Sequence, residues 1–196
     1  MCGGKGASQG DVFGTLPRKG DGVGDNIAGF VLAAGEGKRL RPLTLEKPKA
    51  LIPFCGVPML TFAASQIAAT GIREIGVNAG YCADQVEAFC ASIGDFVPAM
   101  RVSREIDILG TGGGLRKGAA LLPDARHFLV WNADVVFDVD PLVLLHTHLE
   151  RSAAATVFLV PDRGPRTVSM DTDGKIRCFR DTEHRAAYTF SGVHIF

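Results

Sequence analysis

A chain of 196 residues, 46% of them hydrophobic, is long enough to form one domain with a sizeable core. Its 21 basic and 21 acidic residues give a formal net charge of zero. This balance argues against a general nucleic-acid binder or a binder of anionic membranes, because both would carry a basic excess. No apolar run is long enough to span a bilayer, and the first residues show no secretory signal.

The cysteines indicate a reducing compartment. There are five of them, an odd number, and no two have the C-x-x-C spacing. We therefore expect reduced thiols in a cytoplasmic protein, and neither a disulfide framework nor a zinc site.

Strand and helix patterns alternate along most of the chain. Residues 1–26 are rich in glycine and lack hydrophobic periodicity, which predicts a flexible leader before a domain at 27–196. Apolar or alternating residues predict strands at 28–34, 74–79, 99–105, 127–134, 155–161 and 188–196. Amphipathic spacing and terminal Pro or Gly residues predict helices at 58–71, 82–94, 113–122 and 141–152. A β-hairpin is predicted at 167–179.

Repeated βα units are typical of the α/β class, with a largely parallel sheet and helices on both faces. In such sheets, ligands bind outside the carboxyl ends of the strands. Three loops at these ends are therefore the places to look for function.

The first loop, GEGKR at residues 35–39, has the composition of a phosphate-binding loop. Its glycines expose backbone N–H groups to phosphate oxygens. Arg39 adds a planar fork of donors, and Lys49 adds a mobile positive charge. A solvated basic turn would have the same residues, so both interpretations stay open on this loop alone.

The loop matches neither of two common phosphate motifs, which weakens the P-loop and dehydrogenase interpretations. A Walker loop needs Ser or Thr after its Gly-Lys pair, and Arg39 stands there. A dinucleotide fingerprint needs a third glycine, and Leu40 occupies that position.

The second loop, EIDILGTGGGLRKG at 105–118, has three successive glycines after Thr111. They would let a flat ligand approach the backbone, and the N-terminus of the following helix would add its dipole. A loose connector is the alternative, which we disfavour because Gly112–Gly114 are costly at the start of a helix.

The third loop places acidic residues after an apolar strand. Asp134 follows the strand directly, and Asn132 lies two residues earlier. A carboxylate in this place can hold Mg²⁺, which prefers oxygen ligands and shares them with substrate phosphates. Helix capping is the alternative, and it suits Asp140, which precedes Pro141, but not Asp134.

Four segments together resemble the motifs of a known family. They are LAAGEGKRLRPLT…KPKAL (32–51), LGTGGG (109–114), NAD (132–134) and YTFSGVHIF (188–196). In this order they are similar to the motifs of the nucleoside-diphosphate-sugar pyrophosphorylases, which are sugar-1-phosphate nucleotidyltransferases. The N-acetylmuramate 1-phosphate uridylyltransferases and the mannose- or heptose-1-phosphate guanylyltransferases look most similar. The resemblance implies a Rossmann-like, three-layer α/β/α sandwich with a mostly parallel, mixed central sheet.

The resemblance also implies roles for individual residues. It gives catalytic roles to Arg39, Lys49 and Asp134, and it makes Asp134 a ligand of the cofactor Mg²⁺. The implied nucleotide-binding residues are Leu32, Ala33, Ala34, Gly35, Gly37, Lys38, Glu105, Gly110, Thr111, Gly112 and Gly113. Asn132 and Gly192 are the implied contacts of the sugar substrate.

The implied reaction is attack by a sugar 1-phosphate oxygen on the α-phosphorus of an NTP, with release of pyrophosphate. The residues agree with it, because such a transfer needs alignment and charge neutralisation more than covalent chemistry. A non-catalytic, degenerate or regulatory nucleotide- or sugar-nucleotide-binding module is the alternative. A dehydrogenase is third, and Leu40 counts against it.

One departure from the family pattern concerns the end of the chain. The family motifs continue beyond FSG to a late acidic residue that completes the Mg²⁺ site, so we expect this domain to lack its C-terminal end. We also expect the last strand, 188–196, to be an uncovered apolar edge that favours homo-oligomers.

Overall fold

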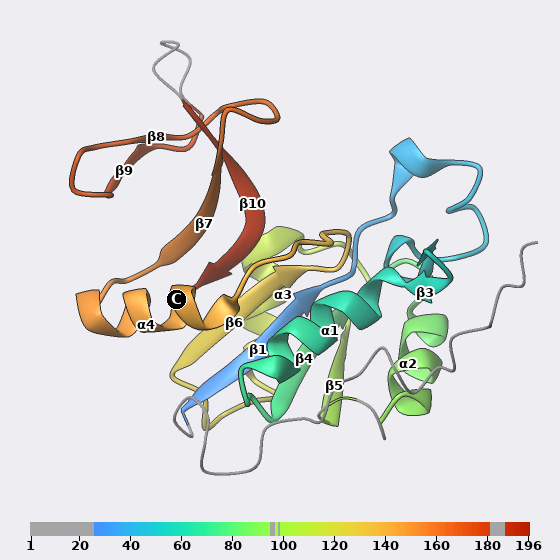
Figure 1. Cartoon of the computed structure of the whole chain (residues 1–196). Coiled ribbons are helices and arrows are strands. Elements are labelled where there is room, and N and C mark those ends of the chain that lie inside the picture. Colours follow the sequence, from blue (N-terminus) through green and yellow to red (C-terminus); the bar gives the residue numbers. More distant parts are fainter. Residues whose placement is uncertain (1–25, 95–96, 98, 181–186) are drawn as a thin grey trace, which may run out of the picture.

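A six-stranded sheet forms the centre of the computed structural model, which describes residues 26–94, 97, 99–180 and 187–196 (Figure 1). The strand order is β5-β4-β1-β6-β10-β7. The strands are β1 (Ile27–Leu32), β4 (Glu74–Ala79), β5 (Ala99–Arg104), β6 (His127–Asn132), β7 (Thr156–Pro161) and β10 (Tyr188–Ile195). The predicted leader lies outside the described residues, apart from its last residue.

The sheet is mostly parallel but mixed. Strand β1 pairs in parallel with β4 on one side and with β6 on the other, and β4 pairs in parallel with β5. Only β10 runs antiparallel to its neighbours, β6 and β7. The chain therefore reverses its direction of travel across the sheet between β1 and β6, and ligands bind at such a switch point.

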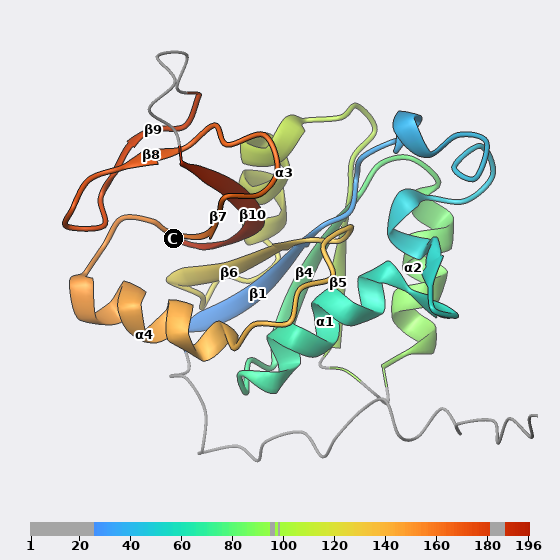
Figure 2. The same ribbon diagram turned by 45° about the horizontal axis from the view of Figure 1, so that its top comes forward.

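Helices cover both faces of the sheet, which confirms the three-layer α/β/α sandwich. Helices α1 (Met59–Ala69), α2 (Ala83–Ser92) and α4 (Pro141–Arg151) lie on one face, and α3 (Gly110–Ala119) lies on the other (Figure 2). Strand β1 shows why, since it is apolar on both sides: Val31 belongs to the core cluster on the face of α1, α2 and α4, and Phe30 belongs to the cluster on the face of α3.

All predicted strands and helices are present, with ends shifted by at most three residues. The hairpin is also confirmed, as β8 (Ser169–Met170) paired antiparallel with β9 (Ile176–Cys178). Asp140 is the N-cap of α4, because its carboxylate accepts a hydrogen bond from the Leu142 amide at 2.9 Å.

Short elements around the first loop were not predicted. They are the 3₁₀ helices η2 (Lys38–Leu40) and η3 (Lys49–Leu51) and the two-residue strands β2 (Pro53–Phe54) and β3 (Val57–Pro58). Each has only two or three residues, too few to show a hydrophobic period.

Two expectations are corrected. The glycine-rich segment is not a loop before a helix, because α3 begins at Gly110 and includes Gly112–Gly114. The last strand, β10, is not an edge, because β6 and β7 flank it; the edges are β5 and β7. Edge pairing at β10 therefore gives no reason to expect homo-oligomers.

Two further observations concern membrane-spanning helices and cysteine pairing. Among the described residues, no helix is both long and apolar enough to cross a membrane. Within the same residues, Cys55, Cys82, Cys90 and Cys178 are all unpaired.

Candidate active site

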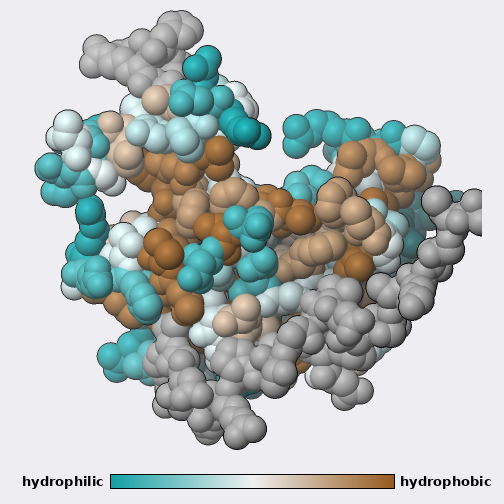
Figure 3. Space-filling view, in the orientation of Figure 1, coloured by the Kyte–Doolittle hydropathy of each residue, from teal (hydrophilic) through white to brown (hydrophobic). Residues whose placement is uncertain are grey.

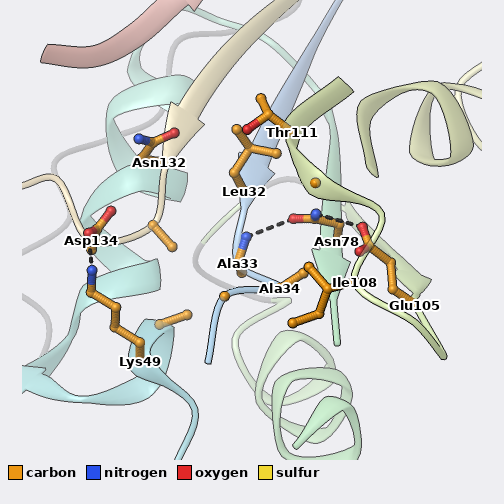
Figure 4. A pocket seen from close by; sticks show the side chains of 14 residues that line it. Leu32, Ala33, Ala34, Lys49, Asn78, Glu105, Ile108, Thr111, Asn132 and Asp134 are labelled. Carbon is orange, nitrogen blue, oxygen red and sulfur yellow. Dashed lines mark hydrogen bonds and ion pairs between the residues drawn. The ribbon is translucent and has the colours of Figure 1, made fainter. Parts of the chain in front are cut away.

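A cavity of about 290 Å³ opens where the chain leaves the carboxyl ends of β1, β4 and β6 (Figure 4). It lies at the switch point of the sheet. Ten of the predicted site residues line it: Leu32, Ala33, Ala34, Gly35, Lys49, Glu105, Gly110, Thr111, Asn132 and Asp134. Figure 3 shows the molecule hollowed between the loop after β1 and the side formed by β7 and β10.

The other predicted residues lie around this cavity or away from it. Gly37, Lys38 and Arg39 line an adjoining hollow that shares Gly35, Lys49 and Asp134 with the cavity. Gly192 packs on Asn132: a Cβ there would lie 2.8 Å from the Asn132 amide nitrogen. Gly112 and Gly113 line neither hollow.

The loop after β1 is built around Gly37. This residue has φ of +65°, which glycine adopts without strain, and a Cβ there would lie 2.9 Å from Lys49 Cβ. The buried Thr44 hydroxyl donates to the Gly37 carbonyl at 3.0 Å. Gly37 therefore lets the loop turn tightly over the segment that carries Lys49.

Side chains from the turn before α2 and from its first turn anchor residues 45 and 46 of the same loop. The Tyr81 hydroxyl donates to the Leu45 carbonyl at 2.5 Å, and Gln85 Nε2 donates to the Glu46 carbonyl at 2.7 Å. The sequence patterns gave no sign of these contacts, because the two residues of each contact are far apart in the chain. The separation is 36 positions for the first contact and 39 for the second.

The charges of the loop are unevenly paired. Lys38 lies 3.2 Å and Arg41 3.7 Å from the Glu36 carboxylate. No described residue forms an ion pair or hydrogen bond with Arg39. The Arg39 guanidinium is thus exposed at the hollow with its donors free for an anion.

Lys49 and Asp134 form an ion pair across the cavity mouth (Figure 4). Helix η3 carries Lys49, and the turn after β6 carries Asp134. The buried Trp131 helps to hold that turn, because its indole N–H donates to the Val135 carbonyl at 3.0 Å. Both charged side chains are partly exposed, so the pair can open when an anionic ligand arrives.

Asp134 is the residue here that could hold a metal ion. Among the described residues there is no cluster of three or more His, Cys, Asp or Glu side chains suited to a metal. A single carboxylate fits Mg²⁺ only when phosphate oxygens and waters supply the other ligands, which is its usual mode in nucleotide sites.

Asn78, at the end of β4, is a cavity residue that the motifs did not indicate. Its side chain accepts a hydrogen bond from the Ala33 amide at 2.7 Å and donates one to the Glu105 carboxylate at 2.8 Å (Figure 4). The available signal was a polar residue between the apolar residues of the strand EIGVNA.

Comparisons with known proteins agree with this geometry. A family model described as nucleotidyl transferase matches residues 28–181. The chain is 35% identical over 159 residues, 78% of its length, to a mannose-1-phosphate guanylyltransferase of Mycobacterium tuberculosis, of which the match covers 43%. It is 30% identical to an N-acetylmuramate alpha-1-phosphate uridylyltransferase of Caulobacter vibrioides, covering 85% of the chain and 73% of that protein.

The fold also matches a solved structure. A glucose-1-phosphate thymidylyltransferase structure from Bacillus anthracis superposes with a TM-score of 0.73 at 22% identity, covering 87% of the chain and 71% of that one. The chain spans less than half the length of several of the curated relatives that it matches.

Proposed function

Because the chain belongs to the nucleotidyl transferase family, we propose that it transfers a nucleotidyl group from an NTP to a sugar 1-phosphate. An oxygen of the sugar phosphate attacks the α-phosphorus, and the bond from that phosphorus to the β-phosphate oxygen breaks. The products are an NDP-sugar and pyrophosphate. The observation that carries the proposal is a cavity and an adjoining hollow at the switch point, which together bring exposed glycine backbone and the cationic side chains of Arg39 and Lys49 beside the Asp134 carboxylate.

The two sides of the cavity take different parts of the substrates. The β1 loop, with Gly35 and Arg39, meets the triphosphate, and the segment from Glu105 to Thr111 lies beside the nucleoside. Asn132 and the adjacent Gly192 lie on the opposite side, where the sugar phosphate would enter. Lys49 stands between the two sides and would exchange the Asp134 carboxylate for phosphate oxygens.

Such a site works by holding charges in line. Arg39 and Lys49 neutralise negative charge that develops on the transferring phosphoryl group, and the loop backbone orients it. The cavity-lining residues include no Ser, Cys or His that could act as a covalent nucleophile. Direct transfer between the two substrates is therefore the mechanism that the residues support.

Mg²⁺ belongs to the proposal as a cofactor held by Asp134 together with the nucleotide phosphates. When bound, the ion neutralises phosphate charge. Asp134 would hold the ion in place of Lys49, whose ammonium would then be available to the substrate phosphates. A cytoplasmic location, where the unpaired thiols stay reduced, is also part of the proposal.

A substrate matrix tests the proposal. The chain is incubated with each of four NTPs and a panel of sugar 1-phosphates, with Mg²⁺ or with EDTA, and pyrophosphate and NDP-sugar are measured. We expect both products only when an NTP, a sugar 1-phosphate and Mg²⁺ are present together. Undiminished activity in EDTA would contradict the role of Mg²⁺, and NTP binding without any product would favour the non-catalytic binding module.

A further inference from the structure

We propose that Asn78 and Glu105 are a positioning pair that sets the shape of the nucleotide side of the cavity and so controls affinity for the NTP. The inference rests on the proposed function for the identity of the ligand. Neither residue needs to touch the reacting atoms. They act through the backbone segments that they hold, which are the end of β1 and the segment before α3.

Three hydrogen bonds run in series across this side of the cavity, and Figure 4 shows the two that Asn78 forms. The Ala33 amide donates to Asn78 Oδ1 at 2.7 Å, and Asn78 Nδ2 donates to Glu105 Oε1 at 2.8 Å. The Leu109 amide donates to the other carboxylate oxygen, Glu105 Oε2, at 2.9 Å. The series connects the strand end that leads into the phosphate loop with the N-cap of α3, so it fixes the separation of two cavity walls.

The pair is buried, which makes its polarity informative. Asn78 is 3% and Glu105 4% exposed. A buried carboxylate is costly unless its oxygens are hydrogen-bonded, and an apolar pair of similar size would often be more stable. The two outer amides both need acceptors, and a carboxylate can only accept. Asn78 accepts from one outer amide and Glu105 accepts from the other, and the Asn78 side-chain N–H group donates to Glu105 between them.

Helix α3 is adapted to the pair. A Cβ at Gly114 would lie 2.5 Å from Glu105 Oε1 and 2.6 Å from Asn78 Nδ2. Glycine inside a helix is destabilising relative to alanine, and here it allows the helix to pack directly on the carboxylate and the amide. The glycine thus serves the network, whereas the sequence suggested close approach of a ligand.

The location of the pair predicts which substrate is affected. The walls that it joins carry the β1 loop and the N-terminal turn of α3, on the nucleotide side. Lys49, Asp134 and Asn132 belong to other segments and make no hydrogen bond with the pair. Loss of the pair should therefore raise KM for the NTP much more than KM for the sugar phosphate.

Exchange of the two functional groups tests the pair. In Asn78→Asp a carboxylate oxygen replaces the donor and faces Glu105 Oε1. In Glu105→Gln the new amide group faces one of the two N–H donors, from Asn78 and Leu109, that hydrogen-bond to the wild-type carboxylate. Each single variant loses one bond. In the double variant, Asn78→Asp with Glu105→Gln, the new amide donates to the new carboxylate, and both outer amides keep an acceptor.

The readouts are the Kd of each of four NTPs without sugar phosphate, KM for both substrates, and the melting temperature. We expect each single variant to bind NTP about tenfold more weakly, as contacting residues in one network are strongly coupled. The double variant should recover most of the affinity. Glu74→Gln is the control, because it makes the same change at the opposite, exposed end of β4 and should leave the Kd unchanged.

The outcomes separate this inference from the proposed function. Pyrophosphate release that is absent in the wild type would overturn the function, while the Kd values would still test the pair. A double variant that binds no better than the singles, or singles with a lowered melting temperature and an unchanged Kd, would overturn the pair. If the single variants do not fold, Gly114→Ala replaces them, because its methyl group would push against the pair from α3. Unchanged NTP affinity in that variant would likewise overturn the proposed role of the pair.

Discussion

At the scale of single residues, the two cationic side chains of the candidate site, Arg39 and Lys49, differ in whether they form an ion pair. Lys49 is held by Asp134, whereas Arg39 has no ion-pair partner among the described residues. The two cations thus differ in what they lose when substrate binds: Lys49 gives up an ion pair, and Arg39 gives up only water. Both were identified from the sequence, but their different states became visible only in the structure.

Replacing either cation tests its proposed role in the transfer. We expect Arg39→Ala and Lys49→Ala each to lower kcat by roughly 10²–10³-fold, the usual effect of losing one group that stabilises developing charge. Arg41→Ala is the matched control, because Arg41 lies two residues from Arg39 and pairs with Glu36. The decrease in kcat should be far smaller in this variant. Steady-state kinetics of pyrophosphate release measures these values. Equal kcat in all three variants would show that Arg39 and Lys49 do not belong to the active site.

Asp134 gives a separate prediction, because it is the proposed metal ligand. Asp134→Asn should raise the Mg²⁺ concentration needed for half-maximal activity and lower the activity itself, since an amide binds Mg²⁺ more weakly than a carboxylate does. The melting temperature should change little, because the side chain is partly exposed. An unchanged Mg²⁺ titration would contradict the assignment.

At the scale of elements, helix α3 shows how close packing determines where glycine is needed. Gly118 faces the aromatic ring of the fully buried Phe30, and a Cβ there would lie 2.2 Å from Phe30 Cε2. Gly112, six residues earlier, has nothing within 4 Å of its Cβ position. The same residue type is thus required at one position of the helix and free at the other.

These two glycines give a matched pair of stability variants. Gly118→Ala should lower the free energy of unfolding by about 1–3 kcal/mol, because the added methyl group forces Phe30 out of its position. Gly112→Ala should leave it unchanged or raise it by up to about 1 kcal/mol, since alanine favours helix. Urea unfolding of both variants checks this, and equal effects would mean that α3 does not pack as described.

At the scale of the whole molecule, stability should depend on pH through His194 on the central sheet. Its Nδ1 has no hydrogen-bond partner among the described residues, and burial lowers its pKa to about 4. The unfolded chain binds a proton near pH 6.5, where the folded protein does not. The folded state therefore loses stability as the pH falls from about 7 to 4, and this group adds no further loss below that.

The expected loss at pH 5 is on the order of 2 kcal/mol relative to pH 7.5. His194→Phe should reduce it, because a phenyl ring in this place can contact Phe190 edge-on and stack on Phe196 without titrating. His148, whose pKa burial and His127 also lower, acts in the same direction and leaves a residual slope. Urea unfolding at both pH values decides: an identical loss in variant and wild type would show that His194 does not contribute.

Local patterns in the sequence were sufficient for the elements and for much of the site. Alternation and helical periodicity act over a few residues, and so β1, α1 and α4 could be predicted without knowledge of their neighbours. The phosphate loop at 35–39 and Asp134 were recognisable for the same reason, because each motif is continuous in the chain. The short helices η2 and η3 escaped prediction, since three residues carry no period.

Only the tertiary structure decided which residues meet. Lys49 and Asp134 are 85 positions apart, Ala33 and Asn78 are 45 apart, and Asn78 and Glu105 are 27 apart. The structure likewise placed β10 inside the sheet and made the glycines of α3 part of a helix. Strand order and helix packing bring such residues together, and these depend on the burial of whole faces, which no local stretch of sequence specifies.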